Sequence, residues 1–292
     1  MKVLILGIDA LEYNLVEEWD LKNLKQKEYG KIKVPITKNL KEPATEIVWP
    51  CFITGEEPEK MGYVNTILYR QPFKWFFENI YTNINSKQGD IHPETILDKR
   101  TKKRELLDIL SSFFKKVGFS YHPTRSNIKA PTIFNYNNKK IAHFHIPVYD
   151  KNVFPDYRKD LVDVISKKTS IPNFTKSVKK SFYNRCNELT EYLKNNKDWD
   201  LVMMYWFCLD GIQHAFFKNK LKIMDFYMLF NEFIGKLKKI LPRDVFLLII
   251  SDHGQKYGIH TNHGFYSSNI NLDMKKDNIT DFKKIIEKKL EE

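Results

Sequence analysis

The sequence predicts an α/β fold in which helices cover both faces of a mainly parallel central sheet, with a cap-like insertion. Three apolar runs of strand length carry this prediction: Val3 to Ile8, Leu201 to Cys208 and Val245 to Ile250. Segments with helical spacing of apolar residues separate these runs, and that alternation is typical of parallel sheets. Of the 292 residues, 42% are hydrophobic, which is enough to build the core of one large domain.

The N-terminal elements alternate between strand and helix. Lys2 to Ile8 is a continuous β-branched and leucine run, as expected for a central strand. Leu11 to Lys25 has apolar residues at helical spacing, and Gly30 to Pro35 is predicted as a short strand. Ile47 to Thr54 is predicted as a short helix with Pro50 in its first turn, where a missing N–H is tolerated.

The pattern changes between residues 66 and 140, where aromatic residues alternate with polar Asn, Lys and Ser runs and no periodicity lasts. We therefore expect an insertion or cap at 66–140 within a single domain that spans residues 1–292.

Regular alternation returns in the remainder of the chain. Strands are expected at Lys140 to Pro147, Asp200 to Phe207 and Val245 to Ile250. Helices are expected at Asp156 to Lys168, Lys176 to Lys194, Leu221 to Ile240 and near Ile279 to Leu290.

Composition limits the location and partners of the chain. No apolar run is long enough for a membrane span, and the N-terminus shows no signal peptide. The cysteines Cys51, Cys186 and Cys208 are unevenly spaced, which favours reduced thiols and a cytoplasmic location. The net charge of +12 suits nucleic acid or another polyanion, but the lysines are spread over nearly every predicted helix and favour an ordinary charged surface. Nothing in the sequence indicates the oligomeric state.

Aspartates follow three of the predicted strands. Asp9 follows the first strand, Asp210 follows Asp200 to Phe207, and Asp252 follows Val245 to Ile250. An aspartate after a strand is often only a helix cap. Three such aspartates in one chain indicate a functional site, because the functional residues of open α/β sheets lie just beyond the carboxyl ends of the strands.

Histidines accompany two of these aspartates. Asp210 and His214 have i, i+4 spacing, which places both on one face of a helical turn. Asp252 and His253 are adjacent and could converge only from a tight turn, which we expect Gly254 to permit. Half of the eight histidines lie between His214 and His263. Carboxylates and imidazoles without thiolates suit zinc, manganese or iron.

Thr45 precedes the short predicted helix, where N–H groups and the helix dipole can receive a phosphate. It is therefore a candidate nucleophile, although a threonine at this place could equally serve only as a helix cap.

Five blocks in order resemble the alkaline phosphatase superfamily, in its type I phosphodiesterase/nucleotide pyrophosphatase branch. They are Leu6-Gly7-Ile8-Asp9-Ala10-Leu11, Thr45 to Gly55 with Pro58 and Gly62, Asp210 to His214, Ser251-Asp252-His253-Gly254 and Asn262-His263-Gly264-Phe265. The resemblance implies an alkaline-phosphatase-like three-layer sandwich and a hydrolase of phosphate esters or phosphoanhydrides.

The same resemblance implies two divalent metal ions about 4 Å apart, zinc with manganese as the alternative. One ion would be held by Asp9, Thr45, Asp252 and His253, and the other by Asp210, His214 and His263, with His260 as the runner-up to His263. Thr45 would attack phosphorus and form a covalent intermediate that water then hydrolyses. The substrate would be a nucleotide or another small phosphate ester.

Two departures from the family pattern affect the substrate. Diesterase members commonly have an apolar residue, proline and a phosphate-binding asparagine after the threonine, whereas this chain has Glu46, Ile47 and Val48. A phosphomonoesterase or phosphotransferase of the same superfamily therefore stays open as an alternative. An alternative of another class is a basic nucleic-acid-binding protein without catalysis, which would show steep salt dependence and no metal requirement. His143 and His145 alternate in a predicted strand and are interpreted as structural.

Overall fold

A computed structural model describes residues 1–36, 42–61, 123–151, 153, 170–272 and 276–292. By its internal contacts the chain divides into one unit formed by Met1–Gly62 with Thr124–Glu292, and a second unit, Tyr63–Pro123. The predicted helix at 156–168 lies outside the described residues, and so does all of the second unit except Pro123. Most of the predicted insertion at 66–140 is outside them too, so the insertion stays a prediction. Of the helices within the described ranges, none combines the length and the hydrophobicity that crossing a bilayer requires.

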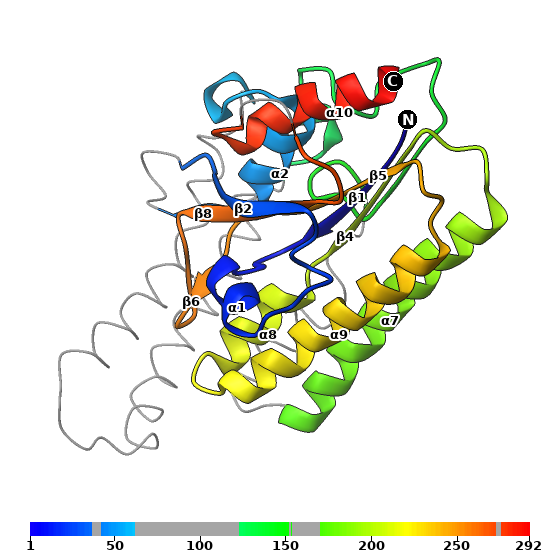
Figure 1. The fold of residues 1–292 in the computed structure, drawn as a ribbon. Helices are drawn as coiled ribbons and strands as arrows, with labels where there is room; N and C mark the ends of the chain where they lie inside the picture. Colours follow the sequence, from blue (N-terminus) through cyan, green and yellow to red (C-terminus); the bar gives the residue numbers. More distant parts are fainter. Residues whose placement is uncertain (37–41, 62–122, 152, 154–169, 273–275) are drawn as a thin grey trace, which may run out of the picture. The chain divides into compact units, whose positions relative to one another are not determined.

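The first unit is built on a six-stranded sheet with the order β2-β8-β5-β1-β4-β3 (Figure 1). β5, β1, β4 and β3 are parallel to one another, whereas β8 runs antiparallel to both β5 and β2. The strands of this sheet are β1 Lys2–Ile8, β2 Glu28–Lys33, β3 Ile141–Phe144, β4 Leu201–Trp206, β5 Val245–Ser251 and β8 His263–Ser268.

Helices cover both faces of this sheet (Figure 1). α2 and α10 pack together on one face, and α7, α8 and α9 pack on the other with α1. The helices are α1 Tyr13–Glu18, α2 Thr45–Thr54, α7 Ile171–Asn195, α8 Cys208–Phe216, α9 Lys220–Ile240 and α10 Phe282–Glu291. Short 3-10 turns are η1 Pro58–Met61, η3 Arg125–Asn127 and η4 Ile279–Asp281. The predicted α/β class with a mainly parallel, doubly covered sheet is confirmed.

The central strands form the core because they are apolar along their whole length. Every residue of β4 and β5 is buried, as is all of β1 after Lys2. Residues of β1 lie between partners on β4 and β5, with Ile8 opposite Trp206 and Gly7 opposite Ile250. The carboxyl ends of these three strands therefore meet at one edge, and the residues that follow them are brought together there.

Two helices differ from the prediction at their ends. The helix predicted at Leu11 to Lys25 is formed only from Tyr13 to Glu18, because the chain turns at Asp20, whose φ is 45°. α2 begins at Thr45 instead of Ile47, so Pro50 lies in its second turn. Gly55 ends α2 with a φ of 67°, a left-handed conformation that costs glycine little.

A short hairpin between β5 and β8 was not predicted. Its strands, β6 Gln255–Lys256 and β7 Ile259–His260, pair with Lys256 opposite Ile259. The two residues between them, Tyr257 and Gly258, have φ values of 55° and 81°. Positive φ at both central residues is the signature of a two-residue turn whose twist matches that of the strands. This hairpin positions His260.

Candidate active site

The predicted site residues come from four elements that meet at the carboxyl edge of the sheet. Asp9 directly follows β1, and Asp210 lies in the first turn of α8, just after β4. Asp252 and His253 directly follow β5, and Thr45 is the first residue of α2. Residues that are far apart in the sequence are thus neighbours, because parallel strands end at the same edge.

Asp9, Asp252 and His253 form the first of two groups that could hold a metal ion. Their ligand atoms lie within 4.8 Å of one another, and none of the three side chains is exposed. His253 Nε2 lies 3.2 Å from Asp9 Oδ1 and 3.5 Å from Asp252 Oδ2. Tyr205 on β4 donates its hydroxyl to Asp9 Oδ2 at 2.5 Å, which fixes the other oxygen toward His253.

Asp210, His214 and His260 form the second group. Asp210 Oδ1 lies 3.2 Å from His214 Nε2 and 3.4 Å from His260 Nε2, and the two imidazole Nε2 atoms are 3.2 Å apart. The i, i+4 spacing on α8 brings Asp210 and His214 to one side of the helix. His260 reaches the same point from the hairpin.

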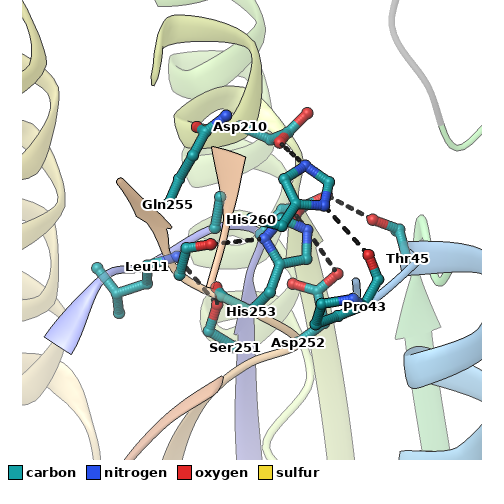
Figure 2. A network of polar contacts seen from close by, with 12 residues as sticks. Leu11, Pro43, Thr45, Asp210, Ser251, Asp252, His253, Gln255 and His260 are labelled. Atoms are coloured by element: carbon teal, nitrogen blue, oxygen red, sulfur yellow. Dashed lines mark hydrogen bonds and ion pairs between the residues drawn. The ribbon is translucent and has the colours of Figure 1, made fainter. Parts of the chain in front are cut away.

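The two groups are contiguous. The rings of His253 and His260 stack with centroids 3.8 Å apart and an interplanar angle of 16°. Thr45 Oγ1 lies 3.5 Å from Asp9 Oδ2, so the threonine hydroxyl borders the first group. Figure 2 shows the two rings lying over one another, with Asp210, Asp252 and Thr45 around them.

His263, rather than His260, was the residue assigned to the second group from the sequence, and the structure places it elsewhere. His263 is the first residue of β8, and its Nε2 lies 3.9 Å from Glu12 Oε1. His260 ends the hairpin strand β7, and its Nε2 lies 3.4 Å from Asp210 Oδ1. The geometry therefore favours His260, the runner-up, over His263 in this position.

The pKa values of two aspartates in the site are shifted in opposite directions. Burial, together with the neighbouring Asp252 carboxylate, raises the pKa of Asp9 well above its usual value. Burial alone would raise the pKa of Asp210 too, but His214 and His260 bring it well below the usual value. The neighbouring residues therefore do not fully balance the negative charges of Asp9 and Asp252 in the first group.

His253 lies inside this negative field. Burial alone would lower its pKa, but Asp252 and Asp9 together raise the pKa to about 10. The field favours a positive charge at this point of the site, whether a proton on His253 or a cation.

Several polar residues of the site were not predicted. Tyr205 bonds to Asp9, Gln255 bonds to His214, and the Glu12 carboxylate accepts from Thr261 beside the site; all three side chains are buried. Each is a single polar or aromatic residue inside or beside an apolar run, so no periodicity or spacing marks it. His143 and His145, interpreted as structural, pair with Asp150 and Glu188 at 2.9 Å and 2.8 Å.

Gly254 is required for a different reason from the one predicted. It does not adopt a positive φ, as a tight turn would need. Instead, a Cβ at this position would lie 2.0 Å from Glu12 Oε2 and 2.7 Å from Thr261 Oγ1. Close approach of the buried Glu12 carboxylate therefore accounts for the glycine.

The sequence matches the family model described as type I phosphodiesterase / nucleotide pyrophosphatase over residues 3–289. The chain belongs to this family. The predicted type I phosphodiesterase/nucleotide pyrophosphatase family is thus confirmed, and members of this family are hydrolases that act on phosphate ester bonds.

Solved structures provide more distant likenesses. Murine ectonucleotide pyrophosphatase / phosphodiesterase 5 is 14% identical with a TM-score of 0.43, over 87% of this chain and 57% of that chain. The PH0037 protein from Pyrococcus horikoshii is 14% identical with a TM-score of 0.45, over 99% and 96%. A mutant of TAB5 alkaline phosphatase with Mg bound is 11% identical with a TM-score of 0.45, over 99% and 97%. The chain thus spans little more than half of the murine protein, and a comparison with curated proteins gave no match.

Proposed function

We propose that the protein is a phosphodiesterase or nucleotide pyrophosphatase that uses Thr45 as its nucleophile and two divalent metal ions, zinc with manganese as the alternative. One observation carries the proposal: two adjacent carboxylate–imidazole groups share an edge of the sheet with the hydroxyl of Thr45. The first ion would be held by Asp9, Thr45, Asp252 and His253. The second would be held by Asp210, His214 and His260, with His260 in the place first assigned to His263.

The donor atoms fit metal ions. Among the described residues, the buried atoms that have no hydrogen-bond partner include Asp9 Oδ1, both carboxylate oxygens of Asp252, Asp210 Oδ1 and His253 Nε2. Buried polar atoms are rarely left without a partner, and five of the fourteen such atoms in the described residues lie in the two groups. Mixed carboxylate and imidazole ligands without thiolates suit zinc or manganese.

The side chains of this chain support a two-step displacement. Thr45 Oγ would lose its proton and form a bond to phosphorus while the bond to the leaving oxygen breaks, giving a threonine phosphoester. Water would then attack the same phosphorus and release Thr45. The bound cations would lower the pKa of the attacking hydroxyl and offset charge on the phosphoryl oxygens.

The start of α2 assists this chemistry. The N–H groups of Ile47 and Val48 both bond to the carbonyl of Ala44. Thr45, the first residue of α2, precedes them at the positive end of the helix dipole. Its N–H would donate to a phosphoryl oxygen there.

A nucleotide is the favoured substrate on family grounds, and a complex with AMP has been described for an inactive form of the murine relative. A phosphomonoesterase or phosphotransferase is the second candidate. It is favoured by Glu46, Ile47 and Val48, which leave out the phosphate-binding asparagine common in diesterases. We also propose that residues 66–140 form an insertion within a single catalytic domain, and that the chain is cytoplasmic, since Cys51, Cys186 and Cys208 are all buried free thiols.

Metal analysis with a substrate panel tests the proposal. Purified protein, Thr45→Ala and the control Thr54→Ala would be assayed with bis-p-nitrophenyl phosphate and p-nitrophenyl phosphate. Thr54 is the last residue of the same helix and is also buried, and its hydroxyl bonds only to the backbone, donating to the Pro50 carbonyl and accepting from the Glu56 N–H. We expect two metal equivalents and a loss of roughly 10³-fold or more in kcat for Thr45→Ala alone. Full turnover by Thr45→Ala would refute the nucleophile. Metal-independent binding of nucleic acid without turnover would favour the alternative class.

A further inference from the structure

Gln255 contacts a histidine of the second group. It lies on β6, is 3% exposed, and its amide nitrogen is 2.8 Å from His214 Nδ1. Its amide oxygen is also buried and has no hydrogen-bond partner among the described residues. No family motif or spacing assigns a role to this side chain.

The two other histidines of the site meet main-chain carbonyls at the same ring atom. His253 Nδ1 lies 3.1 Å from the carbonyl oxygen of Gly254, and His260 Nδ1 lies 3.1 Å from that of Pro43 (Figure 2). A carbonyl oxygen accepts only, so each ring carries its proton on Nδ1. Nε2 then faces the carboxylates, where a cation can take the place of a second ring proton, as a metal ligand requires. His214 is the one that meets a side chain instead.

An amide can serve both tautomers of His214. With the amide nitrogen toward Nδ1, glutamine donates, and the proton of the ring lies on Nε2, 3.2 Å from Asp210 Oδ1. Rotation of the amide by half a turn brings its oxygen to Nδ1, so that glutamine accepts and Nε2 is free to bind a cation. The same rotation gives the unpartnered oxygen a hydrogen bond.

We propose that Gln255 is a positioning residue that holds His214 in the metal-binding tautomer by rotating its amide when a cation enters the second group. The inference rests on the proposed two-metal site and adds the side chain that orients one of its ligands. It acts through His214 and does not touch the substrate.

Titration of purified protein with Zn²⁺ by calorimetry tests the inference, with hydrolysis of bis-p-nitrophenyl phosphate as a second readout. Gln255→Leu removes both amide functions while keeping a similar volume. Gln255→Glu keeps an acceptor for Nδ1–H. Gln26→Leu is the control: Gln26 also donates one amide bond, to the Leu247 carbonyl, and has an unpartnered oxygen, but it lies toward the opposite end of β5.

We expect Gln255→Leu to weaken Zn²⁺ binding at one of the two sites by about 10–100-fold, the range seen when partners of ligating histidines are removed. The other site should be unchanged, Gln255→Glu should restore binding, and Gln26→Leu should match wild type. In ¹⁵N-labelled wild type, the His214 ring should change from the Nε2–H to the Nδ1–H form on addition of Zn²⁺. If wild type binds Zn²⁺ at two sites and Gln255→Leu binds it with unchanged affinity, the inference about Gln255 is wrong while the proposed function stands. A wild type that binds no Zn²⁺ would overturn the inference and the proposed function together.

Discussion

Gly254→Ala tests how tightly the loop after β5 is held. The added methyl would lie 2.0 Å from Glu12 Oε2, whereas real Cβ contacts are essentially never below 3.0 Å, so the carboxylate would have to retreat by about 1 Å. Glu12 is held in place by the N–H of Asn14 at 3.0 Å, by the Asn14 side chain at 2.7 Å and by Thr261 Oγ1 at 3.1 Å.

The expected cost combines two effects. Overpacking costs about 1–3 kcal/mol, and loss of a hydrogen bond to a charged group costs about 1.5–3 kcal/mol. The free energy of unfolding should therefore fall by roughly 2.5–6 kcal/mol. Because the same loop holds His253 and His260, activity should fall as well.

Urea unfolding of metal-free protein, followed by far-UV circular dichroism, measures this change. Gly235→Ala is the control. Gly235 lies within helix α9, where alanine is favoured, and its added methyl would meet the flexible side-chain amide of Asn23. Its stability should stay within about 1 kcal/mol of wild type. In the double variant with Glu12→Ala the two costs should be less than additive, because the clash is gone. A Gly254→Ala protein as stable as wild type would refute this explanation of the glycine.

Tyr205→Phe should lower the free energy of unfolding of metal-free protein by about 1.5–3 kcal/mol, because it removes the hydrogen-bond donor to buried Asp9. The control Tyr183→Phe, at an exposed tyrosine, should change this free energy by no more than about 0.5 kcal/mol. Dialysis against EDTA should destabilise the protein, and Zn²⁺ at 1,000 times the Kd of a site should restore about 4 kcal/mol for that site; equal melting temperatures with and without Zn²⁺ would contradict the metal sites. Burial lowers the pKa of Lys238 from 10.5 to about 8. The unfolded chain binds more protons at this lysine than the folded one between those values, so stability should rise with pH across that window. Lys238→Met should flatten this rise in denaturant titrations, and an unchanged slope would show that Lys238 is not its source.

The part of the site that the sequence predicted is the part determined by strand ends. Asp9, Asp210 and Asp252 each follow an apolar run that is too regular to be anything but a central strand. Parallel neighbours end at one edge, so their convergence follows from topology without any side-chain detail.

The choice between His260 and His263 depends on different information. It is fixed by a hairpin whose strands have two residues each, too short to show a periodic pattern. The same hairpin precedes β8, the strand that runs antiparallel to its neighbours and that the alternation of strands and helices did not predict. Motif order alone favoured His263, whereas the geometry of the turn favours His260.

Glu12 and Tyr205 were missed for a further reason. Both side chains are buried, and each is linked to the site by a hydrogen bond with a residue distant in the sequence. Glu12 accepts from Thr261, and Tyr205 donates to Asp9. Tyr205 lies inside a strand where an aromatic residue is ordinary. Only the packed structure distinguishes it from the other aromatic residues of the core.

The central claim is tested most directly by a crystal structure of the protein grown with Zn²⁺ or Mn²⁺, with anomalous scattering collected at the absorption edge of the metal. We predict two anomalous peaks about 4 Å apart. One should be coordinated by Asp9, Asp252 and His253 next to Thr45, and the other by Asp210, His214 and His260. A single peak, peaks away from Thr45, or coordination by His263 in place of His260 would contradict this account.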